Sequence, residues 1–250
     1  MPNVTDRPIL TVRIHAGLNA NSFLAGLLAV SGATKFMTAQ EFLESKFPNS
    51  NSKLFFEPVS VQHIAGFTCR FETPHEHVHR TPVDIDAIYD QSNLSDGARL
   101  WTKRIWQTVS QAEARVHGVT VDKVHFHEVG RMSNILAVGL IAELFEAINP
   151  VQLIASPIPM GDGTVTCAHG LVPNPAPATL AMLDGVAVRS YPGTGEAVTP
   201  TGLAVLLGLG VTFGGWPEMT VTKHVTTFIP NKIFENTANG TIFALGTALA

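Results

Sequence analysis

Five of the ten histidines in this chain lie in two short stretches, HEHVHR at 75–80 and HFHEVG at 125–130. The first stretch places His75, His77 and His79 at alternate positions. On an extended chain, alternate side chains project from the same face. Neutral imidazole is the commonest nitrogen ligand for zinc, nickel and copper in proteins. These histidines are therefore predicted to bind a divalent late transition metal, with nickel or zinc favoured; the alternative is a solvated loop.

The second stretch adds three candidate metal ligands. In a strand, His125 and His127 would share one face while Phe126 points into the core. Glu128 would point with Phe126 unless the chain bends just after it. We predict that His125, His127 and Glu128 contribute to a metal site; the alternative is a pair of histidines satisfied by backbone hydrogen bonds at a strand end.

Glycine and proline are dense between residues 157 and 202. Glycine-rich loops allow the backbone to approach a ligand closely. Thr199 followed by Pro200 is typical of a helix start, which offers free N–H groups to an anion. We predict one ligand pocket here, and the alternative is that these segments are only tight turns. The residues expected to line the pocket are Gly161, Gly163, His169, Thr199, Thr201 and Gly202.

Composition excludes several classes of function. The net charge is −4 over 250 residues, so no strong basic field favours a nucleic acid or an anionic lipid. No basic segment followed by an apolar run opens the chain, and the apolar segment 135–148 is too short to span a membrane. The two cysteines, Cys69 and Cys167, are far apart in sequence and cannot staple a fold of this size. We expect a cytoplasmic protein with no membrane segment and no nucleic-acid partner.

Hydrophobic periodicity and capping residues predict a mixed α/β fold, with a mixed sheet and helices packed on it. The clearest prediction is a helix over 95–117, with Ser95 as N-cap and Gly118 just past its end. The chain is expected to form one domain over 1–250, or two closely packed lobes with a boundary near 150. Strands are predicted at 8–14, 67–71, 121–129, 151–155, 164–168 and 186–190, and further helices at 23–33, at 134–148, after Pro177 and from Thr199.

The sequence resembles the N-terminal part of the LarC nickel-insertion proteins. The resemblance covers nearly the whole chain and is strongest from 111 to 202. Its most specific parts are AHGLVPNPAPAT and AVTPTG, in the same order and at the same spacing as in that family. The matching stretches are HEHVHR (75–80), QAEARVHGV (111–119), VHFHEVG (124–130), SPIPMGDGTVTCAHGLVPNPAPATLAMLDG (156–185) and GEAVTPTG (195–202).

The resemblance implies a fold, a metal and a substrate. LarC proteins are described as CTP-dependent enzymes that place nickel into a pyridinium bisthiocarboxylate mononucleotide, and such chemistry is classed as a lyase. In that family the histidine-rich stretch is suspected of holding nickel. The family also has a C-terminal region associated with nucleotide binding, which lies beyond this sequence. A partner chain supplying that region, or a homo-oligomer, is therefore expected.

Four positions depart from the family pattern. Arg13, Asn21, Ser133 and Ala137 stand where the family usually has aspartates. Carboxylates at such positions are natural ligands for a hard cation or a metal–phosphate unit. Their replacement is expected to make a cation site neutral or mildly favourable to anions.

Three functions follow from these observations. The leading hypothesis is a LarC-like protein that binds nickel or a related divalent metal, a nickel-pincer-type nucleotide, or both, with a role in cofactor biosynthesis. The second is a catalytically degenerate relative that acts as a binding or assembly partner. The third is a divergent enzyme that acts on another phosphorylated substrate.

Overall fold

The structure is a computed structural model that describes residues 7–76, 79–167, 170–229 and 240–249. It confirms the mixed α/β class. The strands are β1 (Ile9–Ile14), β2 (Lys53–Val61), β3 (Ile64–Glu72), β4 (Gln152–Ala155), β5 (Ile158–Asp162), β6 (Thr164–Cys167), β7 (Gly170–Pro173), β8 (Val188–Thr194), β9 (Thr212–Phe213), β10 (Met219–Thr227) and β11 (Thr241–Ala248). The α-helices are α1 (Ala20–Ser31), α2 (Ala39–Lys46), α3 (Pro82–Asp90), α4 (Asp96–His117), α5 (Met132–Ile148), α6 (Pro177–Ala181) and α7 (Pro200–Gly208), and the short 3₁₀ helices are η2 (Ala33–Lys35) and η3 (Val121–Lys123).

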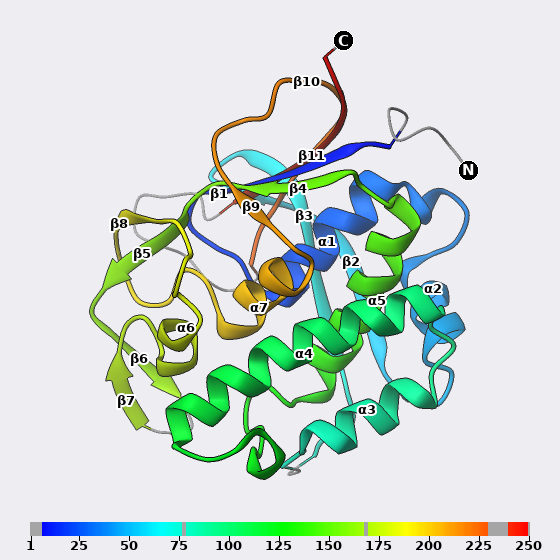
Figure 1. Ribbon diagram of the computed structural model, residues 1–250. Helices are drawn as coiled ribbons and strands as arrows, with labels where there is room; N and C mark the ends of the chain where they lie inside the picture. Colours follow the sequence, from blue (N-terminus) through cyan, green and yellow to red (C-terminus); the bar gives the residue numbers. More distant parts are fainter. Residues whose placement is uncertain (1–6, 77–78, 168–169, 230–239, 250) are drawn as a thin grey trace.

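The main sheet has seven strands in the order β2-β3-β10-β11-β1-β4-β9. Strand β1 reads ILTVRI and is buried along its whole length, as expected for a strand near the middle of a covered sheet. It pairs antiparallel with β11 and parallel with β4, so the sheet is mixed. Helix α1 packs on the sheet, α5 packs on α1, and α4 packs on α5 and α7 (Figure 1).

Helix α1 begins at Ala20, three residues before the start predicted from the apolar run. Asn19 caps it: the side chain accepts a hydrogen bond from the Ser22 N–H, and the Ser22 hydroxyl accepts one from the Asn19 N–H. This reciprocal pair is a capping box, which satisfies two N–H groups that have no partner inside the helix. Inside α1, a Cβ at Gly26 would collide with the ring of Phe243, so glycine allows the helix to lie close to the sheet.

Helix α4 matches its prediction at both ends. The Ser95 side chain accepts a hydrogen bond from the Ala98 N–H, and Gly118 adopts the left-handed conformation after the last turn. A Cβ at Gly208 would lie 2.6 Å from the Cα of Ile105, so α7 approaches the backbone of α4 closely. The end of α7 therefore packs directly on the long helix α4.

The segment 121–129 is not a strand, contrary to the expectation. It forms η3 and then a loop that makes a single bridge, between Arg80 and Phe126. Val124 and Phe126 are buried while His125 is exposed, so the burial alternates with a period of two as it would in a strand. The alternation comes from a loop pressed against α4, where the Phe126 and Trp106 rings lie 5.4 Å apart.

The glycine-rich half forms two further small sheets, β5-β8 and β6-β7, each with two strands. One hydrophobic cluster contains residues on both sides of position 150, from Leu10 to Leu245. This shared cluster does not test the predicted lobe boundary near 150, which stays a prediction. Among the helices of the described residues, none combines the length and the apolar composition that crossing a bilayer requires.

Candidate functional site

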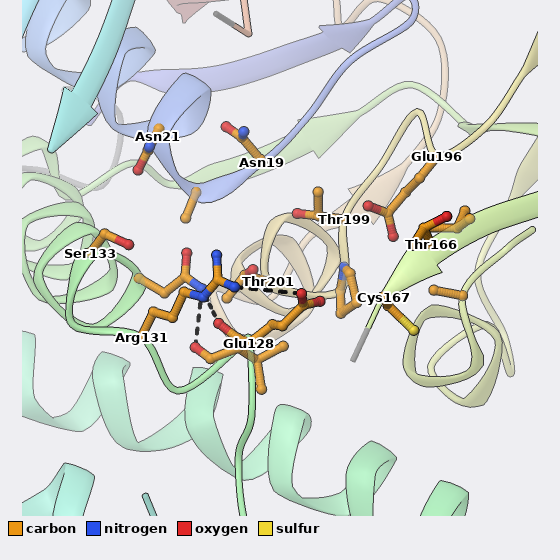
Figure 2. A pocket seen from close by; sticks show the side chains of 16 residues that line it. Asn19, Asn21, Glu128, Arg131, Ser133, Thr166, Cys167, Glu196, Thr199 and Thr201 are labelled. Carbon is orange, nitrogen blue, oxygen red and sulfur yellow. Dashed lines mark hydrogen bonds and ion pairs between the residues drawn. The ribbon is translucent and has the colours of Figure 1, made fainter. Parts of the chain in front are cut away.

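The starts of three helices meet around one cavity of about 290 Å³. Strand β6 provides a further wall, and Figure 2 shows the polar side chains that these elements bring to the cavity. The polar lining residues are Asn19 and Asn21 from α1, Arg131, Ser133 and Asn134 from α5, Thr199 and Thr201 from α7, Thr166 and Cys167 from β6, and Glu128 and Glu196 from loops.

Backbone contacts bring the starts of α1 and α7 together. Leu18 and Val198 form a parallel bridge, and the Thr199 N–H donates to the Leu18 carbonyl at 3.0 Å. A Cβ at Gly202 would lie 2.6 Å from the same carbonyl oxygen. Gly202 is therefore required for the approach of one helix start to the other, whereas the cavity wall is formed by its neighbours Thr199 and Thr201.

The first turns of α1 and α7 carry no acidic residue. Each helix is capped by a neutral side chain: Asn19 accepts from the Ser22 N–H at 2.8 Å, and Thr199 accepts from the Gly202 N–H at 3.2 Å. The N-terminus of a helix carries a partial positive charge from its aligned peptide dipoles. Two such termini on one cavity wall favour an anion there, and the carboxylates of Glu128 and Glu196, which line the same cavity, oppose this preference.

The opposite side of the cavity carries acid and sulfur. Glu128 reaches the middle of the cavity, and Glu196 and Cys167 stand on the far wall (Figure 2). The Arg131 Nη2 lies 3.5 Å from the Glu128 Oε1, so one carboxylate is paired with a guanidinium. The cavity lining therefore combines helix termini and one guanidinium with two carboxylates and a thiol.

A second, smaller cavity of about 60 Å³ adjoins the first. Glu128 and Cys167 line both cavities, and Glu113 and His127 line only the smaller one. A group bound in the large cavity is thus separated from His127 by side chains that can themselves ligate a metal.

Three imidazoles gather beside the small cavity. The ring centroids of His79 and His127 are 4.6 Å apart, and those of His117 and His127 are 6.0 Å apart. His117 lies at the end of α4, where its Nε2 is 3.3 Å from the Oε2 of the buried Glu113. The bridge between Arg80 and Phe126 holds the two histidine-bearing loops side by side.

Within the described ranges, no group of three histidine, cysteine or acidic side chains stands close enough to hold a metal ion. His75 and His125 are exposed, and His77 lies outside the described residues. Of the predicted metal ligands, the structure brings His79 and His127 into contact and places Glu128 between the two cavities.

Comparisons with known proteins show the family of the chain. A family model described as nickel insertion protein matches residues 10–240. The chain belongs to the nickel insertion protein family. A relative from Geobacter metallireducens, whose provisional name is nickel insertion protein, is 36% identical over 86% of this chain and 55% of its own length.

A Staphylococcus epidermidis member of the family is named pyridinium-3,5-bisthiocarboxylic acid mononucleotide nickel insertion protein. It is 34% identical over 83% of this chain and 53% of its own length. The chain therefore spans about half the length of the curated nickel insertion proteins that it matches. No solved structure matches it.

The ligand-binding residues predicted for this chain differ in where the structure places them. Thr199 and Thr201 line the large cavity. Gly161 and Gly163 are not among the lining residues: a Cβ at Gly161 would collide with the Gly193 carbonyl, and Gly163 has a φ of 97° after the end of β5. Gly161 allows β5 and β8 to approach closely, and Gly163 allows the turn between β5 and β6. His169 lies outside the described residues.

Of the four residues that replace the family's aspartates, two line the large cavity and two do not. Asn21 and Ser133 line the large cavity, and the Asn21 Oδ1 is buried with no hydrogen-bond partner among the described residues. The guanidinium of Arg13 instead donates to backbone carbonyls, including that of Gly214 at 3.0 Å, and burial lowers its pKa. Ala137 is fully buried in α5. Only two of the four replacements therefore change the charge of the cavity wall.

Several residues at the two cavities were not predicted from the sequence. The capping-box spacing of Asn19 and Ser22 was a usable signal for the first of them. The spacing of Glu113 and His117, four residues apart on a predicted helix, was another. Arg131 and Glu196 lie in irregular segments with no periodicity, so nothing local indicated them. The residues missed are Asn19, Glu113, His117, Arg131 and Glu196.

Proposed function

We propose that this chain takes part in nickel insertion by binding a phosphorylated pyridinium-type nucleotide in the large cavity and nickel at the adjoining imidazoles. The observation that carries the proposal is the shared wall: Glu128 and Cys167 line both the cavity entered by two helix N-termini and the cavity beside His127. One ligand needs an anion site and the other needs nitrogen or sulfur donors. The anion site and the nitrogen and sulfur donors lie in adjoining cavities.

The phosphate end of the nucleotide would lie at the starts of α1 and α7. Backbone N–H groups and the helix dipoles attract a phosphate there, and Arg131, which is paired with Glu128 at 3.5 Å, brings a guanidinium to the same cavity. Asn21 and Ser133 strengthen this preference because they are neutral. The volume of about 290 Å³ lies at the lower end of the range for small-molecule sites, which begins at about 300 Å³.

Nickel is a cargo in this proposal, so it must be released as well as bound. A closed set of strong ligands would hold it too tightly, whereas the contact between His79 and His127 offers two imidazoles that leave other coordination positions to exchange. Cys167 and Glu128 line the way from His127 to the large cavity. A thiolate at Cys167 is the softer ligand of the two and suits nickel in transit.

The anion side of the proposal is tested by calorimetry with a pyridinium mononucleotide and with the matching nucleoside, which lacks the phosphate. The mononucleotide is expected to bind at least about tenfold more tightly, since charge-assisted hydrogen bonds to phosphate contribute about 1.5–3 kcal/mol. Equal affinities for the two compounds would show that the helix termini do not bind the phosphate.

A charge-restoring variant sharpens this test. Asn21→Asp and Ser133→Asp each place a negative charge on the cavity wall, and each is expected to weaken mononucleotide binding by at least about fivefold through repulsion. Asn51→Asp makes the same change at an exposed position outside the cavity and is the matched control. An unchanged affinity in both cavity variants would contradict the proposed position of the phosphate.

A second candidate function is that of a binding or assembly partner with no insertion activity. The observation that favours it is the neutral wall at Asn21 and Ser133, where the resemblance leads one to expect carboxylates for a hard cation. The purified chain, given nickel, CTP, magnesium and the bisthiocarboxylate precursor, is then expected to bind without turnover. Turnover by this chain alone would establish it as an insertion enzyme and remove the second candidate.

A further inference from the structure

The side chains of Glu76 and Arg80 join the two histidine-bearing loops at one point. Arg80 is buried, and its guanidinium donates to both carboxylate oxygens of Glu76, at 2.9 and 2.5 Å. The same guanidinium donates to the Gly130 carbonyl at 2.8 Å. A planar guanidinium that binds a carboxylate with two parallel hydrogen bonds fixes orientation as well as distance. One arginine of the first loop is thus tied to the end of the second.

The backbone of Arg80 makes a second connection between the loops. Its carbonyl accepts a hydrogen bond from the Phe126 N–H at 2.7 Å, and the Phe126 side chain is fully buried. His79 and His127 are the immediate chain neighbours of these two residues. The ring contact between His79 and His127 is therefore set one residue away from a hydrogen-bonded bridge.

Glu76 also holds the start of α5. The residue at the N-cap of α5, Arg131, makes no side-chain capping bond. Instead the Glu76 Oε1 accepts from the Met132 N–H at 2.9 Å, so a carboxylate distant in sequence takes the place of the cap. The next residue, Ser133, lines the large cavity.

We propose that Glu76 and Arg80 are positioning residues that form a clamp between the two histidine-bearing loops and the start of α5, fixing the contact of His79 with His127 and the start of α5 together. The consequence for binding rests on the proposed function, whereas the geometric part does not. If the clamp opens, the imidazoles separate and the cavity wall formed by α5 moves with them. Nickel affinity and nucleotide affinity would then depend on one ion pair that contacts neither ligand.

The acidity of Glu76 suits this role. The hydrogen bonds from Arg80, its largest favourable influence, lower the pKa of the carboxyl below its ordinary value, and the Met132 N–H adds to this effect. The other charged groups around the pair are Asp84, whose carboxyl is influenced by Arg80, and the Glu128–Arg131 pair beside α5.

The geometric part is tested by NMR on the metal-free chain carrying Arg80→Lys or Glu76→Gln. Lysine keeps the charge but cannot make the two-pronged contact, and glutamine removes the charge with little change of shape. We expect both variants to lose the nuclear Overhauser contact between the His79 and His127 rings and the exchange protection of the Phe126 and Met132 amides. Retention of the ring contact and of both protected amides in both variants would overturn the clamp.

The functional part is tested on the same variants with nickel alone and with the pyridinium mononucleotide alone. Outer residues that orient metal ligands typically change metal affinity by about 10- to 100-fold, and we expect a loss of that size for nickel with a smaller loss for the nucleotide. In the wild type, paramagnetic nickel should broaden the signals of both rings, and in Arg80→Lys of only one.

The matched control is Glu72→Gln. It breaks an exposed ion pair with Arg70, 2.7 Å long, on strand β3 away from the cavities. We expect it to change neither the ring contact nor nickel affinity. If the wild type binds no nickel at these rings, the proposed function fails while the amide and ring measurements still decide the clamp. Should Arg80→Lys fold poorly, Glu76→Gln supplies the same readouts with the buried arginine left in place.

Discussion

The large cavity and the imidazole cluster lie side by side but are built in different ways. The cavity is walled by helix starts, where caps such as Asn19 and Thr199 satisfy the backbone and fix the direction of each helix. His79 and His127 stand on loops that pair through a single backbone bridge and are anchored by Phe126, whereas His117 ends α4. Helix starts are set locally, so the cavity is expected to tolerate loss of a single contact. The imidazole cluster is held by few contacts, each of which matters more.

The largest effect is expected from removing the anchor of the imidazole region. Phe126 is fully buried against Trp106, and replacing a buried phenylalanine by alanine typically costs about 3–5 kcal/mol of unfolding free energy. Urea unfolding of Phe126→Ala should show this loss. At urea concentrations below the unfolding transition, the affinity of this variant for nickel should fall further than its affinity for the mononucleotide. An equal loss of both affinities would contradict the difference between the two regions.

The next effect concerns the histidines of 75–79. We expect the triple replacement of His75, His77 and His79 by alanine to lower nickel affinity by at least about tenfold, because it removes the ring in contact with His127. Mononucleotide affinity should change little. The measurement is equilibrium dialysis with nickel. Equal nickel affinity in the wild type and the variant would show that this stretch does not bind the metal.

Nickel affinity and the stability contributed by Glu76 are expected to depend on pH in different ranges. Nickel requires neutral imidazole, so its affinity should fall as the pH drops and the imidazoles take up protons. The lowered pKa of Glu76 means that its contribution to stability is present above its unfolded pKa, about 4.3, and is lost only as the pH falls through the folded value below that. Nickel should therefore leave well before the fold weakens. Coincident loss of nickel and of amide protection would contradict this order.

The smallest effect is expected from the caps. Asn19→Ala and Thr199→Ala should each cost about 1 kcal/mol of stability, and Thr38→Ala, which removes the cap of α2 away from the cavity, should cost about the same. Only the first two should also weaken mononucleotide binding, by a few-fold, because their helices begin at the cavity. A similar loss of binding in Thr38→Ala would mean that stability, not the helix starts, controls affinity.

Much of the fold could be predicted because its signals are local. Ser95 and Gly118 bound a helix whose ends matched the prediction, and Thr199 with Pro200 indicated the start of α7 correctly. The prediction of a strand over 121–129 was wrong because alternate burial of Val124 and Phe126 also arises in a loop packed against a helix. Periodicity reports which side chains are buried, and not what buries them.

The amino-acid sequence by itself determined the chemistry available to this protein: imidazoles in two stretches, neutral caps at α1 and α7, and glycines where backbones must approach. Only the tertiary structure decided which of these groups meet. His79 and His127 are 48 positions apart and touch because Arg80 and Phe126 pair, and Glu76 caps a helix that begins 56 positions later. Such contacts depend on how α4, α5 and the sheet pack as a whole, since no local pattern records the distance between two loops.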